Sequence, residues 1–166
     1  MTAPQPLLYE IEGWGTGEVW LDRSRLLWHE LPRPAAVKGT GSERRPARCS
    51  SAAGERLVGR IESYFAGRQE SFEDVDLELE GWTPFQLAVL RALRRVSWGE
   101  VVSYGELAAL AGYPRAQRAV GTFCARNRFG LVVPCHRVVG ADGIGSYGSL
   151  GPLYKRRLLA LEGVTF

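Results

Sequence analysis

Two helix-start signals in the second half of the sequence most constrain how this chain of 166 residues can fold. At the first signal, Thr83 supplies a hydroxyl for the helix N-cap, Pro84 takes the first helical position, and Gln86 completes a capping box. The apolar residues that follow lie on one face of the predicted helix: Phe85, Val89, Leu90, Leu93 and Val96. We therefore expect a helix that begins at residue 84 and packs this face into a core.

A second capping box opens a shorter helix, and a third helix follows after a tight turn. Ser103 and Glu106 have the capping-box spacing, and Gly112 with Pro114 beyond it ends this helix. The third helix is expected over residues 115–126. Its predicted core stripe is Ala116, Ala119, Val120, Phe123 and Cys124. Its opposite face carries Arg115, Arg118, Gly121, Thr122 and Ala125. Two such helices are typical of a helix-turn-helix. The small opposite face fits close approach to a DNA groove, or is an ordinary exposed face.

The first half of the sequence has the pattern of a small antiparallel sheet followed by a helix. Alternating apolar runs between turn signals predict strands at residues 7–11, 18–21 and 26–30. Helical spacing of apolar residues predicts a helix over residues 55–65. Residues 34–54 are rich in Ala, Gly, Ser, Pro and Arg, which predicts a mobile loop.

An acidic stretch, residues 70–80, is expected to hold one short strand and the connection to the second half. The sequence therefore predicts an α/β domain over residues 1–82 and a mainly α domain over residues 83–166. Charge follows this division: residues 1–82 carry 10 basic and 14 acidic side chains (−4), and residues 83–166 carry 11 and 4 (+7). All the basic residues of the second half except Lys155 are arginines, which suit forked contacts to phosphate. The second half is predicted to meet a nucleic acid, with a solvated basic face as the alternative.

Cysteine usage and hydropathy indicate the class of protein. Cys49, Cys124 and Cys135 are odd in number and have no paired spacing, so we expect free thiols in a reducing compartment. Cys124 is expected in the core and Cys49 in the loop. No segment approaches the run of about 20 apolar residues that crosses a membrane, and residues 1–8 lack a secretory-signal pattern. His29 and His136 are the only histidines and no zinc-ligand spacing occurs, so no metal site is expected.

An apolar run leads into the residues that can carry chemistry. Residues 131–133 are predicted to be a buried strand or extended segment, and Pro134 fixes the approach of the chain to Cys135. A thiol with a pKa near about 8.5 needs a base to become a nucleophile, and His136 is adjacent. In an extended chain the two side chains point to opposite sides, so a bridging water would connect them. The alternative is a buried structural cysteine beside a satisfied core histidine.

The segment around Cys135 resembles the active-site signature of the O6-alkylguanine-DNA alkyltransferases, also named methylated-DNA–protein-cysteine methyltransferases. The resemblance covers about residues 83–162, and its motifs stand in the family's order: Phe85-Gln86, Ser103-Tyr104-Gly105-Glu106, Arg118-Ala119-Val120-Gly121, Asn127, Val133-Pro134-Cys135-His136-Arg137-Val138, Gly145-Ser146-Tyr147-Gly148, Lys155 and Leu158-Leu159-Ala160-Leu161-Glu162. Three features depart from the family's pattern. Arg128 follows Asn127 where proline is common, the loop after Tyr147 lacks the usual glycine doublet, and Trp98 stands where a tyrosine is more usual.

The resemblance implies a role for each of these residues. Cys135 would accept the alkyl group, and His136 would remove its proton through a water, with Glu162 behind the imidazole. Tyr104 would contact the flipped guanine and assist its departure, and Lys155 would help to polarise the site. The guanine pocket would be lined by Val138, Tyr147, Gly148 and Ser149. DNA would be contacted by Arg115, Arg118, Gly121, Thr122 and Ala125. Arg118 would enter the duplex to fill the gap left by the flipped nucleotide, and Asn127 would be the hinge between the recognition helix and the active-site segment.

The implied fold is an RNase H-like α/β N-terminal domain followed by a mainly α, winged-helix-like domain. The implied function is DNA repair by direct, stoichiometric and irreversible transfer of an alkyl group from O6 of guanine in duplex DNA, with nucleotide flipping and no cofactor. O4 of thymine is a further candidate substrate atom. The protein is expected to act as a monomer without an obligate protein partner or a membrane. Its expected location is the cytoplasm, with the nucleoid, or the nucleus in a eukaryote.

Three other functions compete with repair. A non-catalytic alkyltransferase-like lesion sensor would bind the damaged base, but such proteins replace the acceptor cysteine, and Cys135 is present. A helix-turn-helix regulator with a structural cysteine would explain Arg118 but not Cys135, Tyr104 and Glu162 together. A cysteine hydrolase would need an oxyanion hole, and the sequence identifies none.

Overall fold

The computed structural model describes residues 5–34 and 51–166. The chain divides into two compact units: unit 1 comprises Met1–Arg68 and Val75–Glu78, and unit 2 comprises Gln69–Asp74 and Leu79–Phe166. Cys49 and most of the loop predicted over residues 34–54 lie outside the described residues. In the two described ranges, no helix has the length and apolar character to span a membrane.

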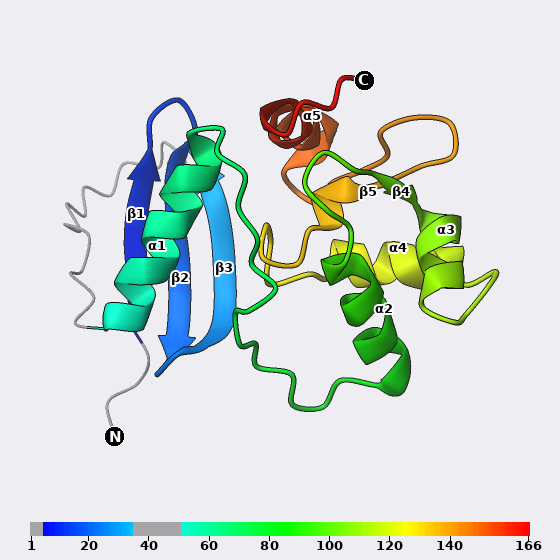
Figure 1. Cartoon of the computed structure of the whole chain (residues 1–166), viewed down its shortest axis with the longest axis horizontal. Coiled ribbons are helices and arrows are strands. Elements are labelled where there is room, and N and C mark those ends of the chain that lie inside the picture. Colours follow the sequence, from blue (N-terminus) through cyan, green and yellow to red (C-terminus); the bar gives the residue numbers. More distant parts are fainter. Residues whose placement is uncertain (1–4, 35–50) are drawn as a thin grey trace. The chain divides into compact units, whose positions relative to one another are not determined.

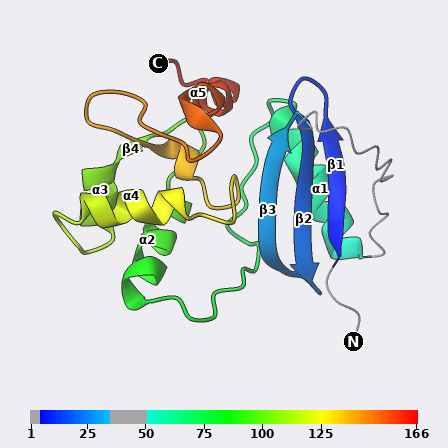
Figure 2. The same ribbon diagram turned by 180° about the vertical axis from the view of Figure 1, so that it is seen from behind.

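The described part of unit 1 combines a small antiparallel sheet with one helix. Strands β1 (Pro6–Ile11), β2 (Gly15–Asp22) and β3 (Arg25–Arg33) pair in that order, which confirms the predicted sheet. Helix α1 (Ala52–Phe65) lies across one face of the sheet in Figure 1, and Figure 2 shows the strands in front of it. The helix begins earlier than predicted, because the Ser51 hydroxyl caps it by accepting the Gly54 N–H at 3.2 Å.

The core of unit 1 forms where the sheet meets α1. Val19 and Leu26 from the strands and Ile61 and Tyr64 from the helix are all almost completely buried. The strand predicted within residues 70–80 is wrong in extent, because only Leu77 pairs with Leu26, in an isolated bridge. Its neighbours on both sides are acidic and largely solvent-facing, so little apolar surface is available to extend the pairing.

Helix α2 (Pro84–Arg94) opens unit 2 as the sequence predicts. The capping box is complete: Gln86 N donates to Thr83 Oγ1 at 3.2 Å, and Thr83 N donates to Gln86 Oε1 at 2.9 Å. The predicted core face is buried at Val89, Leu90, Leu93 and Val96, and Phe85 at the start of the helix is half-buried.

Helices α3 (Tyr104–Leu110) and α4 (Gln117–Ala125) follow, and α4 has a narrower core stripe than predicted. Val120 and Phe123 are buried, whereas Cys124 is half-buried and Ala119 is exposed. Successive helical residues lie about 100° apart around the axis, so Ala119 falls at the edge of the stripe that Val120 centres. Arg115 precedes the helix in a left-handed conformation with φ 75°.

A pair of very short parallel strands carries the candidate site. β4 (Val102–Ser103) pairs with β5 (Val138–Val139), and the 3-10 turn η1 (Cys135–Arg137) leads directly into β5. Residues 131–133 are buried as predicted, but Leu131 has φ 71° and the segment turns rather than forming a strand. Helix α5 (Gly151–Leu161) completes the unit.

Candidate functional site

Cys135 lies at the start of η1 and is 3% exposed. Asn127, just after α4, donates from Nδ2 to Cys135 Sγ at 3.2 Å and to Val133 O at 2.9 Å. Its Oδ1 accepts the Phe129 N–H at 2.8 Å. One amide side chain therefore ties the end of α4 to both the buried loop and the thiol. The geometry is compatible with the hinge role that the resemblance implies for Asn127.

The surroundings of Cys135 favour the neutral thiol. Burial raises its pKa well above the ordinary value, and a hydrogen bond with the thiol of Cys124 raises it further. The Asn127 bond and the positive charge of Lys155 act in the opposite direction, but they are the smaller effects. Cys135 is therefore protonated in the free protein at neutral pH, and a reaction through its thiolate needs a base.

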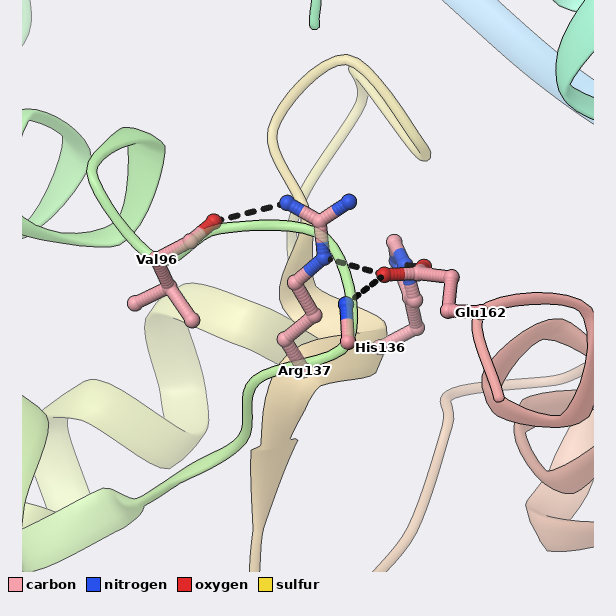
Figure 3. Close-up of polar contacts among 5 residues, drawn as sticks. Val96, His136, Arg137 and Glu162 are labelled. Atoms are coloured by element: carbon pink, nitrogen blue, oxygen red, sulfur yellow. Dashed lines mark hydrogen bonds and ion pairs between the residues drawn. The ribbon is translucent and has the colours of Figure 1, made fainter. Parts of the chain in front are cut away.

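A buried polar network lies next to Cys135 in the chain (Figure 3). His136 is completely buried, and its Nε2 bonds to Glu162 Oε2. Glu162 Oε1 accepts from Arg137 Nε at 2.8 Å and from Gly99 N at 3.2 Å. Arg137 Nη1 in turn donates to Val96 O at 2.7 Å. Glu162 lies at the C-cap of α5 rather than within the helix, so the end of α5 and the turn η1 are joined by this network.

The network fixes the state of the imidazole. Because the Glu162 carboxylate already accepts from Arg137 and Gly99, it acts as the acceptor toward His136, and Nε2 carries the proton. Nδ1 is then the basic nitrogen of the neutral ring. Burial lowers the pKa of His136, and the Glu162 bond opposes this only in part. His136 is therefore neutral near pH 7 and able to accept a proton.

The extended geometry predicted for Cys135 and His136 is wrong. The residues Cys135–Arg137 form a 3-10 turn, in which successive side chains are about 120° apart rather than on opposite sides. The turn forms because Pro134 adopts φ −80° and ψ 62° and the Arg137 N–H donates to Pro134 O at 2.9 Å. It lets His136 and Arg137 reach Glu162 together.

Lys155 of α5 brings a buried amine to the same region. Its side chain is completely buried, and Nζ donates to Val138 O at 2.5 Å and to Ser146 O at 3.1 Å. Burial lowers its pKa to about 8, against the opposing influence of Cys124 and Cys135. Near neutral pH the group is mostly a cation, and its charge acts on the Cys135 thiol.

Tyr104 and the loop after β5 surround the lysine. The Tyr104 ring centroid lies 5.8 Å from Lys155 Nζ. Burial raises the pKa of the Tyr104 hydroxyl, and a hydrogen bond with Ser146 opposes this in part. Gly145 has φ 77°, and a Cβ there would lie 3.3 Å from the Tyr104 hydroxyl and 3.4 Å from Lys155 Nζ. The left-handed φ favours glycine at this position, and a Cβ would make tight contacts with both side chains.

The remaining predicted pocket residues differ in accessibility. Val138 is completely buried, and Tyr147 is half-buried and stacks on Tyr154 with ring centroids 6.1 Å apart. Gly148 and Ser149 are exposed. These loop residues could therefore meet a ligand directly, whereas Val138 contributes through its backbone, whose carbonyl is held by Lys155.

The predicted DNA-contacting residues lie on the surface of unit 2. Arg115, Arg118, Thr122 and Ala125 are exposed, and Gly121 is half-buried. Thr122 Oγ1 donates back to Arg118 O at 3.2 Å, so the Thr122 side chain projects little from that face of α4. Arg128, which follows Asn127, has its guanidinium carbon 5.0 Å from the centroid of the Phe129 ring.

Arg137, Gly99 and Cys124 take part in the site although the sequence analysis assigned them no role there. Arg137 follows Cys135 and His136 in the motif, and this position could have predicted its part in the site. No local signal connects Gly99 with Glu162, or Cys124 with Cys135, because each pair is joined only by the fold. Across the two described ranges, no cluster of three or more His, Cys, Asp or Glu side chains could hold a metal ion.

Comparison with known proteins gives matches of one family. The family model described as "6-O-methylguanine DNA methyltransferase, DNA binding domain" matches residues 84–164. The methylated-DNA–protein-cysteine methyltransferase of Methanosarcina acetivorans is 49% identical over 105 residues, which are 63% of this chain and 65% of that protein. The protein of the same name from Mycobacterium bovis is 47% identical over 106 residues, or 63% of this chain and 62% of that protein. The matches therefore span somewhat less than two thirds of these curated relatives.

Solved structures match over nearly the whole chain. A crystal structure of Mycobacterium tuberculosis OGT in complex with DNA has a TM-score of 0.74 and 35% identity, and covers 93% of this chain and 90% of that one. A crystal structure of the O6-methylguanine methyltransferase of the same organism has a TM-score of 0.76 and 31% identity, with 96% and 93% coverage. The chain belongs to the O6-methylguanine-DNA methyltransferase family.

Proposed function

We propose that this protein repairs alkylated DNA by transferring the alkyl group from O6 of guanine to Cys135. The observation that carries the proposal is the buried Cys135 thiol beside a completely buried His136 that is bonded to Glu162. A charged network of this kind is costly to bury, and its position next to a nucleophilic side chain favours a chemical role. Family membership supplies the substrate class.

The transfer itself is a displacement at carbon. His136 takes the thiol proton, through a bridging water, and the thiolate attacks the alkyl carbon. The sulfur–carbon bond forms as the carbon–O6 bond breaks, and its electron pair returns to the purine, which takes up a proton. Tyr104 is the proposed donor near the leaving base, and the net result exchanges the thiol proton for the alkyl group. The Lys155 cation stabilises the thiolate that develops at Cys135 and then the negative charge that passes to the purine.

The product explains why each molecule should act once. A thioether has no easy hydrolytic route back to the thiol, so the reaction is stoichiometric and irreversible. No cofactor enters this balance. O4 of thymine presents the same kind of aryl–alkyl ether and is a second candidate substrate atom.

Access to Cys135 requires the base to leave the stack. The acceptor is 3% exposed, so an alkyl group inside a duplex cannot reach it. We propose that the face of α4 formed by Arg118, Gly121, Thr122 and Ala125, with Arg115 before it, lies against the minor groove of double-stranded DNA. Arg118 would replace the flipped nucleotide, which offsets part of an unstacking cost of a few kcal/mol. The base would enter between Tyr104, the Val138 backbone and the Tyr147, Gly148 and Ser149 loop.

We also propose the architecture of each unit, the oligomeric state and a role for Asn127. We assign unit 1 to an RNase H-like and unit 2 to a winged-helix-like architecture, with helices α3 and α4 as the helix-turn-helix. One monomer would act on one lesion without a protein partner. Asn127 would act as the hinge that couples α4 to Cys135, through its bonds to Val133 O and Cys135 Sγ.

The direct test is transfer of a labelled methyl group from an O6-methylguanine duplex to the protein. We expect label to appear on the wild type up to one equivalent and to be absent from Cys135→Ser. Cys124→Ser is the matched control, because it removes the neighbouring thiol and should keep the capacity of one equivalent. Tight binding of the duplex without transfer by the wild type would overturn the proposal in favour of a lesion sensor.

A further inference from the structure

A groove on the surface of unit 1 combines aromatic and acidic side chains. It has a volume of about 430 Å³ and is lined by residues of two neighbouring strands: Glu18 and Trp20 from β2, and Leu27, Trp28 and Glu30 from β3. Side chains alternate between the two faces of a strand, and the intervening Val19 and His29 are buried on the side of α1. The groove therefore lies on the face of the sheet turned away from α1, which Figure 2 shows in front of the helix.

The tryptophans and glutamates form two cross-strand pairs. Trp20 lies directly opposite Trp28, and Glu18 lies directly opposite Glu30. Each indole N–H donates to the carboxylate of its own strand: Trp20 Nε1 to Glu18 Oε2 at 3.2 Å, and Trp28 Nε1 to Glu30 Oε1 at 2.7 Å. Both bonds point toward the same end of the groove, because the two pairs are in register. The groove thus has an aromatic end and an anionic end.

The two carboxylates stand in positions that disfavour a sheet. Like charges directly opposite each other on neighbouring strands repel. Among the described residues, the only cation that reaches this pair is Arg33, whose Nη2 lies 3.8 Å from Glu30 Oε2. An ion pair of this length between solvent-exposed side chains contributes little. A further cation held between Glu18 and Glu30 would offset their repulsion.

A guanidinium matches both ends of this groove. It is planar and weakly hydrated, it presents forked N–H donors to carboxylates, and it stacks on aromatic faces. Indole is the aromatic group that attracts cations most strongly. The groove is open enough for a side chain to enter, since 43% of the Trp28 surface is exposed. The net charge of −4 over residues 1–82 attracts a basic segment to this part of the protein.

We propose that this groove is a docking site for an arginine side chain in a basic segment of a partner protein. The guanidinium donates to Glu18 Oε1 and Glu30 Oε2, the oxygens that the indoles do not engage, and lies against the rings of Trp20 and Trp28. All the lining residues belong to unit 1. The docking site is therefore separate from the groups that transfer the alkyl group, and the transfer itself needs no partner.

The test uses the full chain and two matched peptides. One is an acetylated and amidated glycine peptide with two arginines, and the other has citrulline in their place, which keeps the shape and removes the charge. Binding is followed through the indole N–H signals in nuclear magnetic resonance spectra, assigned with Trp20→Phe and Trp28→Phe. We expect the arginine peptide to shift the signals of Trp20 and Trp28 and to leave those of Trp82 and Trp98 in place. The citrulline peptide should bind at least about tenfold more weakly.

The matched variant combines Glu18→Gln and Glu30→Gln, which keeps the size of both side chains and removes their charge. We expect its affinity for the arginine peptide to fall by about tenfold or more, with a wild-type rate of methyl transfer and no loss of thermal stability. Equal affinity for the two peptides, or equal affinity of the wild type and the variant, would overturn the proposal. A wild-type dimer in sedimentation that the variant abolishes would also overturn it, because the occupant would then be a second copy of this chain.

Discussion

Each unit of the molecule buries one histidine, and the two differ in what they contact. In unit 1, His29 is 4% exposed and its Nε2 bonds to the Tyr9 hydroxyl at 2.5 Å. In unit 2, His136 is completely buried and bonds to Glu162, which also pairs with Arg137. The first pair consists of two side chains that can both be neutral, whereas the second is tied to a carboxylate and a guanidinium.

The comparison teaches that burial alone does not identify a functional histidine. A neutral His–Tyr pair satisfies two polar groups in a core and contributes about 1 kcal/mol to stability. A buried charge network is a poor way to gain stability, because desolvation offsets most of its Coulomb energy. Among the described residues, the buried Arg137, Lys155 and Glu162 all lie in unit 2 with His136, in the unit that contains Cys135. We infer that unit 1 is built for stability and that the chemistry belongs to unit 2.

The largest expected effect comes from exchanging the two histidines in turn. We expect His136→Gln to slow methyl transfer by about 10²–10⁴-fold, because the base that accepts the Cys135 proton is lost. We expect His29→Leu to leave the transfer rate unchanged and to lower the free energy of unfolding by about 1–3 kcal/mol. Single-turnover transfer and chemical denaturation measure the two effects. The comparison breaks if His29→Leu slows transfer as much as His136→Gln at a temperature where both variants are folded.

Arg118→Ala should separate the DNA-facing surface from the reacting groups. Arg118 is exposed. We expect the variant to transfer from duplex DNA about 10–100-fold more slowly, because it loses a wedge that contributes about 1.4–2.8 kcal/mol to nucleotide flipping. Transfer from a free O6-alkylguanine base should keep its wild-type rate, since no nucleotide has to be flipped. Equal losses on the duplex and on the free base would show that Arg118 acts on the chemistry instead.

Lys155→Met is expected to slow transfer about tenfold, because one unit of thiol pKa corresponds to about 1.4 kcal/mol. The lysine pKa of about 8 also makes a prediction for the wild type. Below this pH the amine is a cation that favours the Cys135 thiolate, and above it the charge and its help are lost. The rate of transfer from a free O6-alkylguanine base should therefore rise with pH and level off above about 8. The rate of Lys155→Met should continue to rise, and an identical break in both profiles would contradict this assignment.

Asn127→Asp should have the smallest effect, a few-fold decrease in the alkylation of Cys135 by iodoacetamide at fixed pH. The amide bond from Asn127 lowers the Cys135 pKa, so replacing the donor by a carboxylate raises that pKa and reduces the thiolate fraction. Because the pKa of Cys135 is already raised by burial, alkylation in either protein should keep increasing through the alkaline range. Modification of Cys135 is followed by peptide mass spectrometry, and faster alkylation in the variant would contradict this account.

Much of the fold could be predicted because its signals are local. The Thr83–Gln86 capping box, the alternation in the first half and the apolar face of α2 depend on residues a few positions apart. The errors occur where tertiary packing decides. Ala119 fits a helical stripe but lies at its edge, and the segment before Cys135 turns because the buried loop is anchored by Asn127.

The site was predicted as a set of residues rather than as a geometry. The motif around Cys135 identified the thiol, the histidine and, through the resemblance, Glu162. Periodicity gives no information on the Arg137 to Glu162 pair or on the Gly99 contact, because these residues are brought together by the turn η1 and the end of α5. The burial of Lys155 likewise depends on the carbonyls of Val138 and Ser146, which accept hydrogen bonds from its Nζ.

The central claim is that Cys135, and not its neighbour Cys124, accepts one alkyl group. It is tested most directly by digesting the protein after reaction with excess O6-methylguanine duplex and locating the added methyl group by mass spectrometry. The account predicts one methyl group per molecule, an increase of about 14 Da, found on the peptide that contains Cys135. A methyl group on the Cys124 peptide, or none on any cysteine while the duplex binds tightly, would contradict it.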